Sequence, residues 1–299
     1  MAVSTTRTLR PEGPCNDSGM TLFSKRDLLP PIAINSFHDF RAGRREYRSL
    51  VEAQNAAASS NSSTYSSDAL TKTVVEKTEL FRSSAMVNDQ AIASGEFALL
   101  AATLRFRDLM HLSVLDFGGA AGASYYRARP WISATSVDWR VVETNAMVEA
   151  ARSGAPAELS FHTTLSAATT GWTKPPELVL LSSTLQYLDD PEVALTDLVN
   201  MGPEVLLLAR TPLAESNRSH IVLQRSRLSE NGPGPLPTGT SDCSVAYPAT
   251  YVPLEMVRHT LDTGYRHIHH IVEQSRLRAL RGGVVIGQHS FIAHGPRTR

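Results

Sequence analysis

The sequence lacks most of the features that mark secreted, membrane-spanning or nucleic-acid-binding proteins. Its 299 residues include only 2 cysteines, Cys15 and Cys243, too few for a disulfide framework or a cysteine-rich metal site. No apolar run approaches the roughly 20 residues that cross a bilayer, and the N-terminus lacks the apolar core of a signal peptide. The 29 basic and 29 acidic residues cancel, and no basic cluster suits a phosphate backbone. We therefore expect a cytoplasmic protein whose partner is neither a nucleic acid nor a membrane.

The length fits one large α/β domain with additional segments. Residues 1–68 are rich in proline and serine and predict an N-terminal extension that is partly disordered, with a helix at about 36–58 followed by a serine-rich linker. Residues 69–110 predict a helical cap made of two helices. In residues 111–299, apolar runs alternate with helical patterns. The glycine- and proline-rich insertion at 213–250 predicts a mobile loop, and a lid over a ligand is one interpretation of it.

The stretch Ser113–Gly122 has the composition of a ligand-binding turn. Val114 and Leu115 suit a buried strand, and Asp116 ends the apolar run. The glycines that follow allow a sharp bend from a strand into a helix, whose free N–H groups favour a ligand. The dinucleotide fingerprint G-x-G-x-x-G has no full match here, so the turn indicates a nucleotide of another kind or an ordinary connection.

A second carboxylate follows at a suitable distance. Glu143 lies 27 positions after Asp116, at the end of a strand predicted at 136–142. A carboxylate accepts two charge-assisted hydrogen bonds from a ribose diol, and doubly wound sheets place such an acid about 20 residues beyond the glycine turn. The alternative is an exposed acid that favours the start of a helix.

Several segments together resemble a known family. LDFGGAAG, VVE, LLSSTLQYLDDP, ARTP and AYP follow one another between residues 115 and 248. They resemble class I S-adenosylmethionine (SAM)-dependent methyltransferases, in particular a family of bacterial methyltransferases of undefined substrate. The resemblance covers roughly residues 75–293. It implies a Rossmann-like, doubly wound seven-stranded sheet that is parallel except for one strand. It also implies SAM as the cofactor and S-adenosylhomocysteine (SAH) as the product.

The resemblance also implies which residues bind the cofactor. They are Asp116, Gly118, Gly119, Ala120, Gly122, Glu143, Ser182 and Ser183. The sequence departs from the family at three points. Ala120 replaces the middle glycine of the turn, and residues 161–164 contain no carboxylate for the adenine amino group. Ala209 stands where the family tends to carry an acid before Arg210.

The acceptor side of the reaction has several candidate residues. Methyl transfer to a hydroxyl or a protonated amine needs a general base, most often a histidine or a carboxylate. The candidates for catalysis are His220, Tyr187 and Arg210. The candidates for acceptor binding are Gln186, Tyr187, Arg210, Tyr247 and Tyr251. Arg210 suits a carboxylate, and Tyr187 could stack on adenine or on the acceptor. We expect a small-molecule acceptor that is methylated on oxygen or nitrogen.

Two other functions remain open on the sequence. An NAD-dependent oxidoreductase is disfavoured by the incomplete fingerprint and by the lack of an evident Tyr-x-x-x-Lys pair. A non-catalytic binding protein that keeps the fold is the other, because no general base is unmistakable. His267, His269 and His270 predict strand positions rather than a metal site, since no cysteine or acidic set accompanies them. The oligomeric state, including a homodimer, is open.

Overall fold

The computed structural model describes residues 45–60, 62, 64, 67–85, 96–106, 108–134, 136–280 and 283–297. Most of the predicted N-terminal extension, including Cys15, lies outside these ranges. So does the first part of the second predicted cap helix. No helix within the described ranges has the length and apolarity that a membrane crossing requires.

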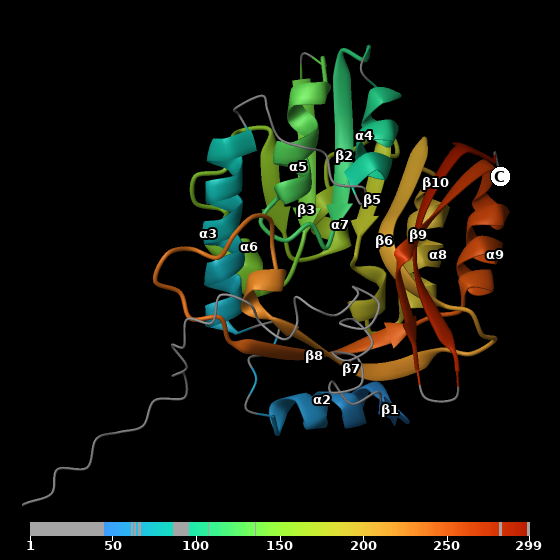
Figure 1. Ribbon diagram of the computed structural model, residues 1–299. Coiled ribbons are helices and arrows are strands. Elements are labelled where there is room, and N and C mark those ends of the chain that lie inside the picture. Colours follow the sequence, from blue (N-terminus) through green and yellow to red (C-terminus); the bar gives the residue numbers. More distant parts are fainter. Residues whose placement is uncertain are drawn as a thin grey trace, which may run out of the picture.

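The larger of two sheets has seven strands in the order β4-β3-β2-β5-β6-β10-β9 (Figure 1). Neighbours from β4 to β6 pair in parallel, whereas β10 is antiparallel to both β6 and β9. The strands are β2 (His111–Phe117), β3 (Ser136–Val142), β4 (Leu159–His162), β5 (Leu178–Ser182), β6 (Val205–Ala214), β9 (Tyr265–Ala279) and β10 (Val285–Pro296). This order confirms the expected Rossmann-like, doubly wound sheet with one antiparallel strand.

Helices cover both faces of this sheet because the central strands are apolar on both sides. In β5, Leu178 and Leu180 belong to one core cluster and Val179 and Leu181 to the other. The first face carries α3 (Asp68–Ala85), α4 (Phe97–Leu104), α5 (Ala123–Ala128) and α6 (Asn145–Ala151). The second carries α7 (Leu165–Thr169), α8 (Pro191–Met201) and α9 (Leu254–Gly264). Figure 1 shows α3, α5 and α6 gathered on one side and α8 and α9 on the other.

Side chains cap the starts of two helices that follow strands of the large sheet. The Thr144 side chain accepts a hydrogen bond from Met147 N at the start of α6. The Asp190 side chain accepts one from Val193 N at the start of α8, where Pro191 occupies the first position. These caps fix where α6 and α8 begin.

A second, smaller sheet was not predicted. It has the order β1-β7-β8 and consists of β1 (Glu46–Tyr47), β7 (His220–Arg227) and β8 (Ser244–Tyr251). The prediction of a mobile loop at 213–250 is therefore wrong where β7 and β8 lie. Buried apolar side chains such as Leu223 and Ala246 pack this ribbon against Ala57.

The N-terminal residues join this smaller sheet. The helix predicted from residue 36 begins, within the described ranges, only at Leu50: α2 covers Leu50–Ala58, and Ser49 caps it. Residues just before it form β1, which pairs with β7. In Figure 1 the small sheet and α2 lie below the lower ends of the large sheet. The extension and the insertion therefore form one structural unit.

A buried lysine links α3 to the turn between β7 and β8. Lys77 is fully buried, and its Nζ donates hydrogen bonds of 2.7 Å to the carbonyl oxygens of Ser229 and Asn231. Burial lowers the pKa of this ammonium group. These two hydrogen bonds hold the turn on α3.

Replacing Lys77 by methionine should therefore destabilise the protein. We expect the free energy of unfolding in urea to fall by roughly 1–3 kcal/mol, because two partly buried carbonyls lose a charged donor. Lys72 lies on the same helix with its side chain 76% exposed, so Lys72→Met is the control and should change stability by less than about 0.5 kcal/mol. Equal losses in the two variants would contradict this role of Lys77.

Candidate active site

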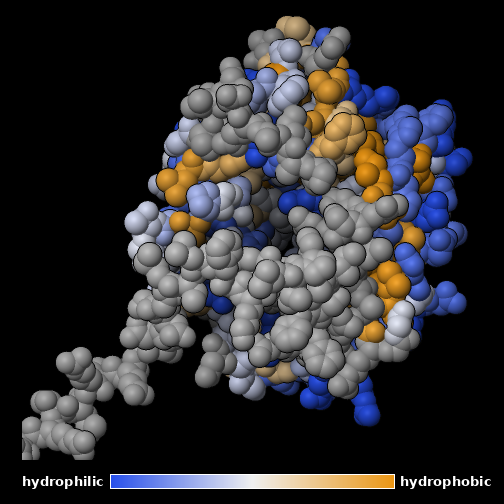
Figure 2. Space-filling view, in the orientation of Figure 1, coloured by the Kyte–Doolittle hydropathy of each residue, from blue (hydrophilic) through white to orange (hydrophobic). Residues whose placement is uncertain are grey.

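The strand order reverses between β2 and β5. From β2 the chain proceeds to β3 and β4 on one side, and β5 leads to β6 on the other. In open α/β sheets the ligand lies outside the carboxyl ends of the strands at such a switch point. The glycine turn after β2 and the segment Ser182–Tyr187 after β5 flank this point. Figure 2 shows a hollow near the middle of the molecular surface in this view. In the same orientation, Figure 1 places the lower ends of β2 and α5 there, above the small sheet.

Close packing explains why glycine occupies two positions of the turn. A Cβ atom at Gly118, whose φ is +75°, would overlap the side chain of Thr184. A Cβ atom at Gly119 would stand within 2.5 Å of the Asp116 carboxyl group. The turn thus lies directly on the end of β2 and against the segment after β5, with its backbone toward the switch point.

Asp116 lies beneath this turn and is completely buried. The indole N–H of Trp139 donates to its Oδ2 at 3.2 Å, and Oδ1 has no hydrogen-bond partner among the described residues. Burial raises the pKa of Asp116 to about 7, and the nearby Glu143 adds to the rise. Trp139 and the positive charge of Arg210 act in the opposite direction. The carboxyl group therefore changes charge near neutral pH.

Glu143 meets the turn from the neighbouring strand. Its Oε1 accepts a hydrogen bond from Ala120 N at 3.2 Å, and its Oε2 accepts one from Thr144 N at 2.8 Å. Gly118 N also donates to the carbonyl of Val142, the residue just before Glu143. The structure thus brings together the two sequence signals, the glycine turn and the distant carboxylate.

Backbone strain gathers along the same edge. Among the described residues, the non-glycine positions with positive φ are Ala120 (48°), Ser183 (55°) and Arg210 (52°). They lie at or just beyond the carboxyl ends of the paired parts of β2, β5 and β6, three adjacent strands. Such conformations cost about 1–3 kcal/mol each and cluster at functional sites. This concentration marks the edge independently of any sequence motif.

Arg210 is held in its strained conformation from two strands. Its N–H donates to Ser290 Oγ at 2.9 Å, and its carbonyl accepts from Gln288 Nε2 at 3.0 Å. Its guanidinium Nε and Nη2 donate to Ser182 Oγ at 3.0 and 2.9 Å. The pairing of β10 with β6 shifts register between His289 and Phe291, so the bulge places Ser290 opposite Arg210.

Gln186 and three tyrosines connect this edge to the small sheet. Gln186 is 2% exposed, and its Nε2 donates to Ser183 O at 2.9 Å. The rings of Tyr187 and Tyr247 meet edge to face at 5.1 Å between centroids, and Tyr251 packs in the same cluster as Tyr187. Burial raises the pKa of Tyr187 well above its usual value, so its phenol is neutral at physiological pH.

His220 lies elsewhere. It is 1% exposed on β7, with Nε2 2.8 Å from Ser216 Oγ and Nδ1 3.1 Å from Glu46 Oε1. The contact of His220 with Glu46, together with the ion pair between Arg218 and Glu46, ties β1 to the rest of the small sheet. No recorded contact joins His220 to the described residues of the glycine turn, and a catalytic role for it stays a prediction.

Sequence reasoning missed three residues of the edge: Thr184, Gln288 and Ser290. Thr184 follows two serines that were singled out, and its contact with Gly118 needs the pairing of β2 with β5. Gln288 and Ser290 reach Arg210 only through the bulge in β10, about 80 residues further along the chain. No local pattern signals such a contact.

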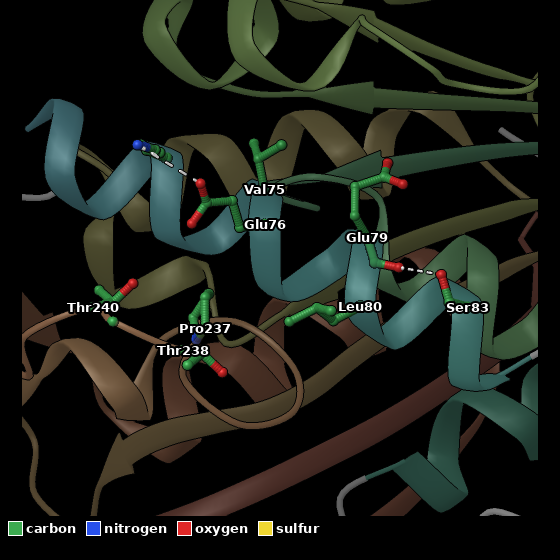
Figure 3. Close-up of a pocket in the computed structure, with 10 residues that line it drawn as sticks. Val75, Glu76, Glu79, Leu80, Ser83, Pro237, Thr238 and Thr240 are labelled. Carbon is green, nitrogen blue, oxygen red and sulfur yellow. Dashed lines mark hydrogen bonds and ion pairs between the residues drawn. The ribbon is translucent and has the colours of Figure 1, made fainter.

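A groove of about 630 Å³ lies apart from this edge, between α3 and the connection from β7 to β8 (Figure 3). It is lined by Lys72, Val75, Glu76, Glu79, Leu80, Ser83, Pro237, Thr238, Gly239 and Thr240. None of these residues belongs to the glycine turn or to the segment after β5.

No protein-family model matches the sequence, and no curated protein matches it. Among solved structures, the chain is similar to the sugar N-methyltransferase KedS8 from Streptoalloteichus sp ATCC 53650, with 17% identity and a TM-score of 0.41 over 70% of this chain and 91% of that one. It is also similar to SAM-bound CalS10, an amino pentose methyltransferase from Micromonospora echinaspora, with 14% identity and a TM-score of 0.42 over 73% and 97%.

A SAM-dependent methyltransferase from Clostridium acetobutylicum ATCC 824 has 10% identity and a TM-score of 0.42 over 74% of this chain and 98% of its own. Likenesses at this distance carry no argument about function. The fold assignment rests on the strand order and pairing described above.

The pKa of Asp116 predicts a pH-dependent stability. The carboxyl titrates near 4 in an unfolded chain and at about 7 in the folded protein. The folded state therefore holds the proton more tightly, and stability falls as the pH rises between these values. Asp116→Asn removes this loss. The free energy of unfolding is measured in urea for the variant and for wild type. The variant's value minus the wild-type value should be about 3 kcal/mol larger at pH 8 than at pH 5.

The control for this comparison is Asp189→Asn, which changes an exposed carboxylate. Its difference from wild type should be the same at both pH values. An Asp116→Asn difference that is also independent of pH would show that the buried carboxyl does not titrate in this range.

Proposed function

We propose that this protein is a SAM-dependent methyltransferase that methylates an oxygen or nitrogen atom of a small-molecule acceptor. The observation that carries the proposal is the contact between Ala120 N and Glu143 Oε1 at 3.2 Å. It puts a carboxylate suited to a ribose beside a turn that has no room for a side chain at residues 118 and 119, at the switch point of a doubly wound sheet.

The residues of this edge fit the cofactor. The buried Asp116 Oδ1, without a described partner, calls for a donor such as the ammonium group of a methionine moiety. Residues 118–122 offer backbone without side-chain bulk, and Glu143 offers two oxygens to a diol. Ser182 and Ser183 follow the next strand. When bound, the cofactor supplies an activated methyl group for transfer to a nucleophile.

The protein's own contribution is to position the acceptor and to exclude water. The small sheet covers the carboxyl edge, because Tyr247 of β8 packs on Tyr187 after β5. Tyr187 is a neutral phenol and serves better as a hydrogen-bond donor than as a base. A neutral amine acceptor needs no general base at all.

The proposal predicts that SAM and SAH raise the melting temperature. At about 100 times the dissociation constant, binding adds about 2.7 kcal/mol, which is a shift on the order of 5 °C for a chain of this size. Gly119→Ala should abolish the shift, because the new Cβ atom would stand within 2.5 Å of the Asp116 carboxyl group and distort the turn. Thermal unfolding with and without SAH measures this.

Gly154→Ala is the matched control. Gly154 has a φ of +79°, but nothing lies within 4 Å of its would-be Cβ atom. This variant should melt at a lower temperature than wild type and keep the full shift with SAH. If millimolar SAH leaves the melting temperature of wild type unchanged, and the protein changes the fluorescence of NADH, the oxidoreductase alternative replaces the proposal.

The ribose role of Glu143 has a test of its own. Glu143→Gln keeps the shape of the side chain and removes the charge, so the affinity for SAH should fall roughly 10- to 100-fold, the value of one or two charge-assisted hydrogen bonds. Isothermal titration calorimetry measures the change. The control is Glu149→Gln, an exposed position on α6, which should bind SAH as wild type does. An unchanged affinity in Glu143→Gln would remove this residue from the site.

A further inference from the structure

The two last strands of the large sheet carry histidines on both of their faces. Side chains alternate along a strand, so His267 and His269 of β9 share one face. His294 of β10 pairs directly with His267 and lies on that face too. His270 and His289 stack on each other at 5.1 Å between ring centroids. The sequence predicted strand positions for the histidines of β9, but it gave no sign of His294, which lies 25 positions beyond His269.

Two imidazole nitrogens of the first face approach each other across the strands. His269 Nε2 and His294 Nε2 are 3.1 Å apart, with 20° between the planes of the two rings. The ring of His267 stacks on that of His294 at 4.9 Å between centroids. Paired strands and stacked rings therefore hold both nitrogens in place before any ligand arrives.

The separation of these nitrogens fits two neighbouring ligands of one metal ion. Imidazole nitrogens bind Zn²⁺ at about 2.0–2.1 Å, and a tetrahedral ion would need them about 3.4 Å apart. At a similar bond length, the observed 3.1 Å corresponds to an angle of roughly 95° at the ion. Square-planar and octahedral ions place neighbouring ligands at about 90°, and Cu²⁺ and Ni²⁺ favour such geometries and imidazole ligands.

Without an ion, the two rings share a proton. A neutral imidazole has a single N–H, so a hydrogen bond between His269 and His294 needs that N–H on the Nε2 of one of them. An ion takes the place of this hydrogen bond when the proton moves from Nε2 to Nδ1 of the same ring. Both rings then stay neutral, and each offers a lone pair to the ion.

The surroundings admit a cation from solvent. The side chain of His269 is exposed, and that of His294 is half-buried. Arg105 and Glu204 both act electrostatically on His294, but they form an ion pair with each other at 2.6 Å, so their charges largely cancel. Among the described residues, no three metal-ligating side chains come together. The chelate therefore has two protein ligands, and water completes the coordination.

We propose that His269 and His294 form a chelating site for one divalent ion of the Cu²⁺ and Ni²⁺ class. The ion cross-links β9, an edge strand of the large sheet, to its neighbour β10. His294 pairs with Val205, the first residue of β6, so the site lies at the end of the sheet opposite the carboxyl edge. It is independent of the methyltransferase function proposed above.

The probe is Cu²⁺, titrated into the full-length protein without an affinity tag. Isothermal titration calorimetry gives the affinity, and the nitrogen hyperfine splitting in the electron paramagnetic resonance spectrum counts the imidazoles on the ion. Wild type should bind Cu²⁺ through two imidazoles. His269→Phe and His294→Phe keep a ring for stacking but remove the nitrogens, so each should weaken this binding about tenfold or more. Mg²⁺, which prefers oxygen ligands, should not bind there.

Two further variants serve as controls. His259→Phe changes an exposed histidine on α9 and should bind Cu²⁺ as wild type does. His267→Phe keeps the stack on His294 and should change the affinity by less than about threefold. An affinity within twofold of wild type in both His269→Phe and His294→Phe would overturn the proposal. So would a loss in His267→Phe as large as theirs, because the ion would then not be held by the proposed pair.

Wild type also offers a test that needs no variant. Paramagnetic Cu²⁺ at substoichiometric amounts should broaden the imidazole NMR signals of His269 and His294 while leaving that of His162 sharp. His162 lies on β4, the opposite edge strand of the sheet. Uniform broadening of all three signals would show that the ion has no preference for this pair, and the proposed site would be wrong.

Discussion

The contact of Gly119 with the buried carboxyl group of Asp116 sets the shape of the candidate site. A Cβ atom at position 119 has no room there, so the chain must bend tightly over the end of β2. This bend carries Ala120 N to within 3.2 Å of Glu143. It also exposes backbone, not side chains, at the point where the strand order reverses. The Glu143 carboxylate, the turn and the segment after β5 meet because β3, β2 and β5 are neighbours in the sheet, and the tight bend over Asp116 keeps side chains out of that meeting point.

The small sheet gives this open edge a cover. Tyr187 stands on the segment after β5 and packs against Tyr247 of β8, and Lys77 holds the turn between β7 and β8 on α3. His220 and Glu46 join the N-terminal strand to the same unit. Residues 46–58 and 220–251 thus contribute to one layer over the candidate site.

Local patterns predicted the parts of the molecule that local chemistry determines. The glycine turn depends on a few consecutive residues, and the apolar runs that alternate with helical patterns in residues 111–299 are local patterns of the same kind. The small sheet was missed because its pairing is non-local. Glu46 pairs with Val222, which lies more than 170 positions further along the chain. The glycine- and proline-rich connection that follows β7 led to the prediction of a loop, although buried and less buried side chains alternate along part of β7. The hydrogen bond from Arg210 N to Ser290 was not predicted for the same reason, since it depends on a bulge in β10 that has no signal in the local sequence.

We propose that the turn after Asp116 and the carboxylate of Glu143 hold the two halves of one adenosyl ligand, and a crystal structure of the protein grown with SAH is the decisive test. We expect ribose hydroxyl groups within hydrogen-bond distance of both Glu143 oxygens, with the homocysteine part lying along residues 118–122. SAH bound away from this edge, or seated there with Glu143 turned from the ribose, would contradict it.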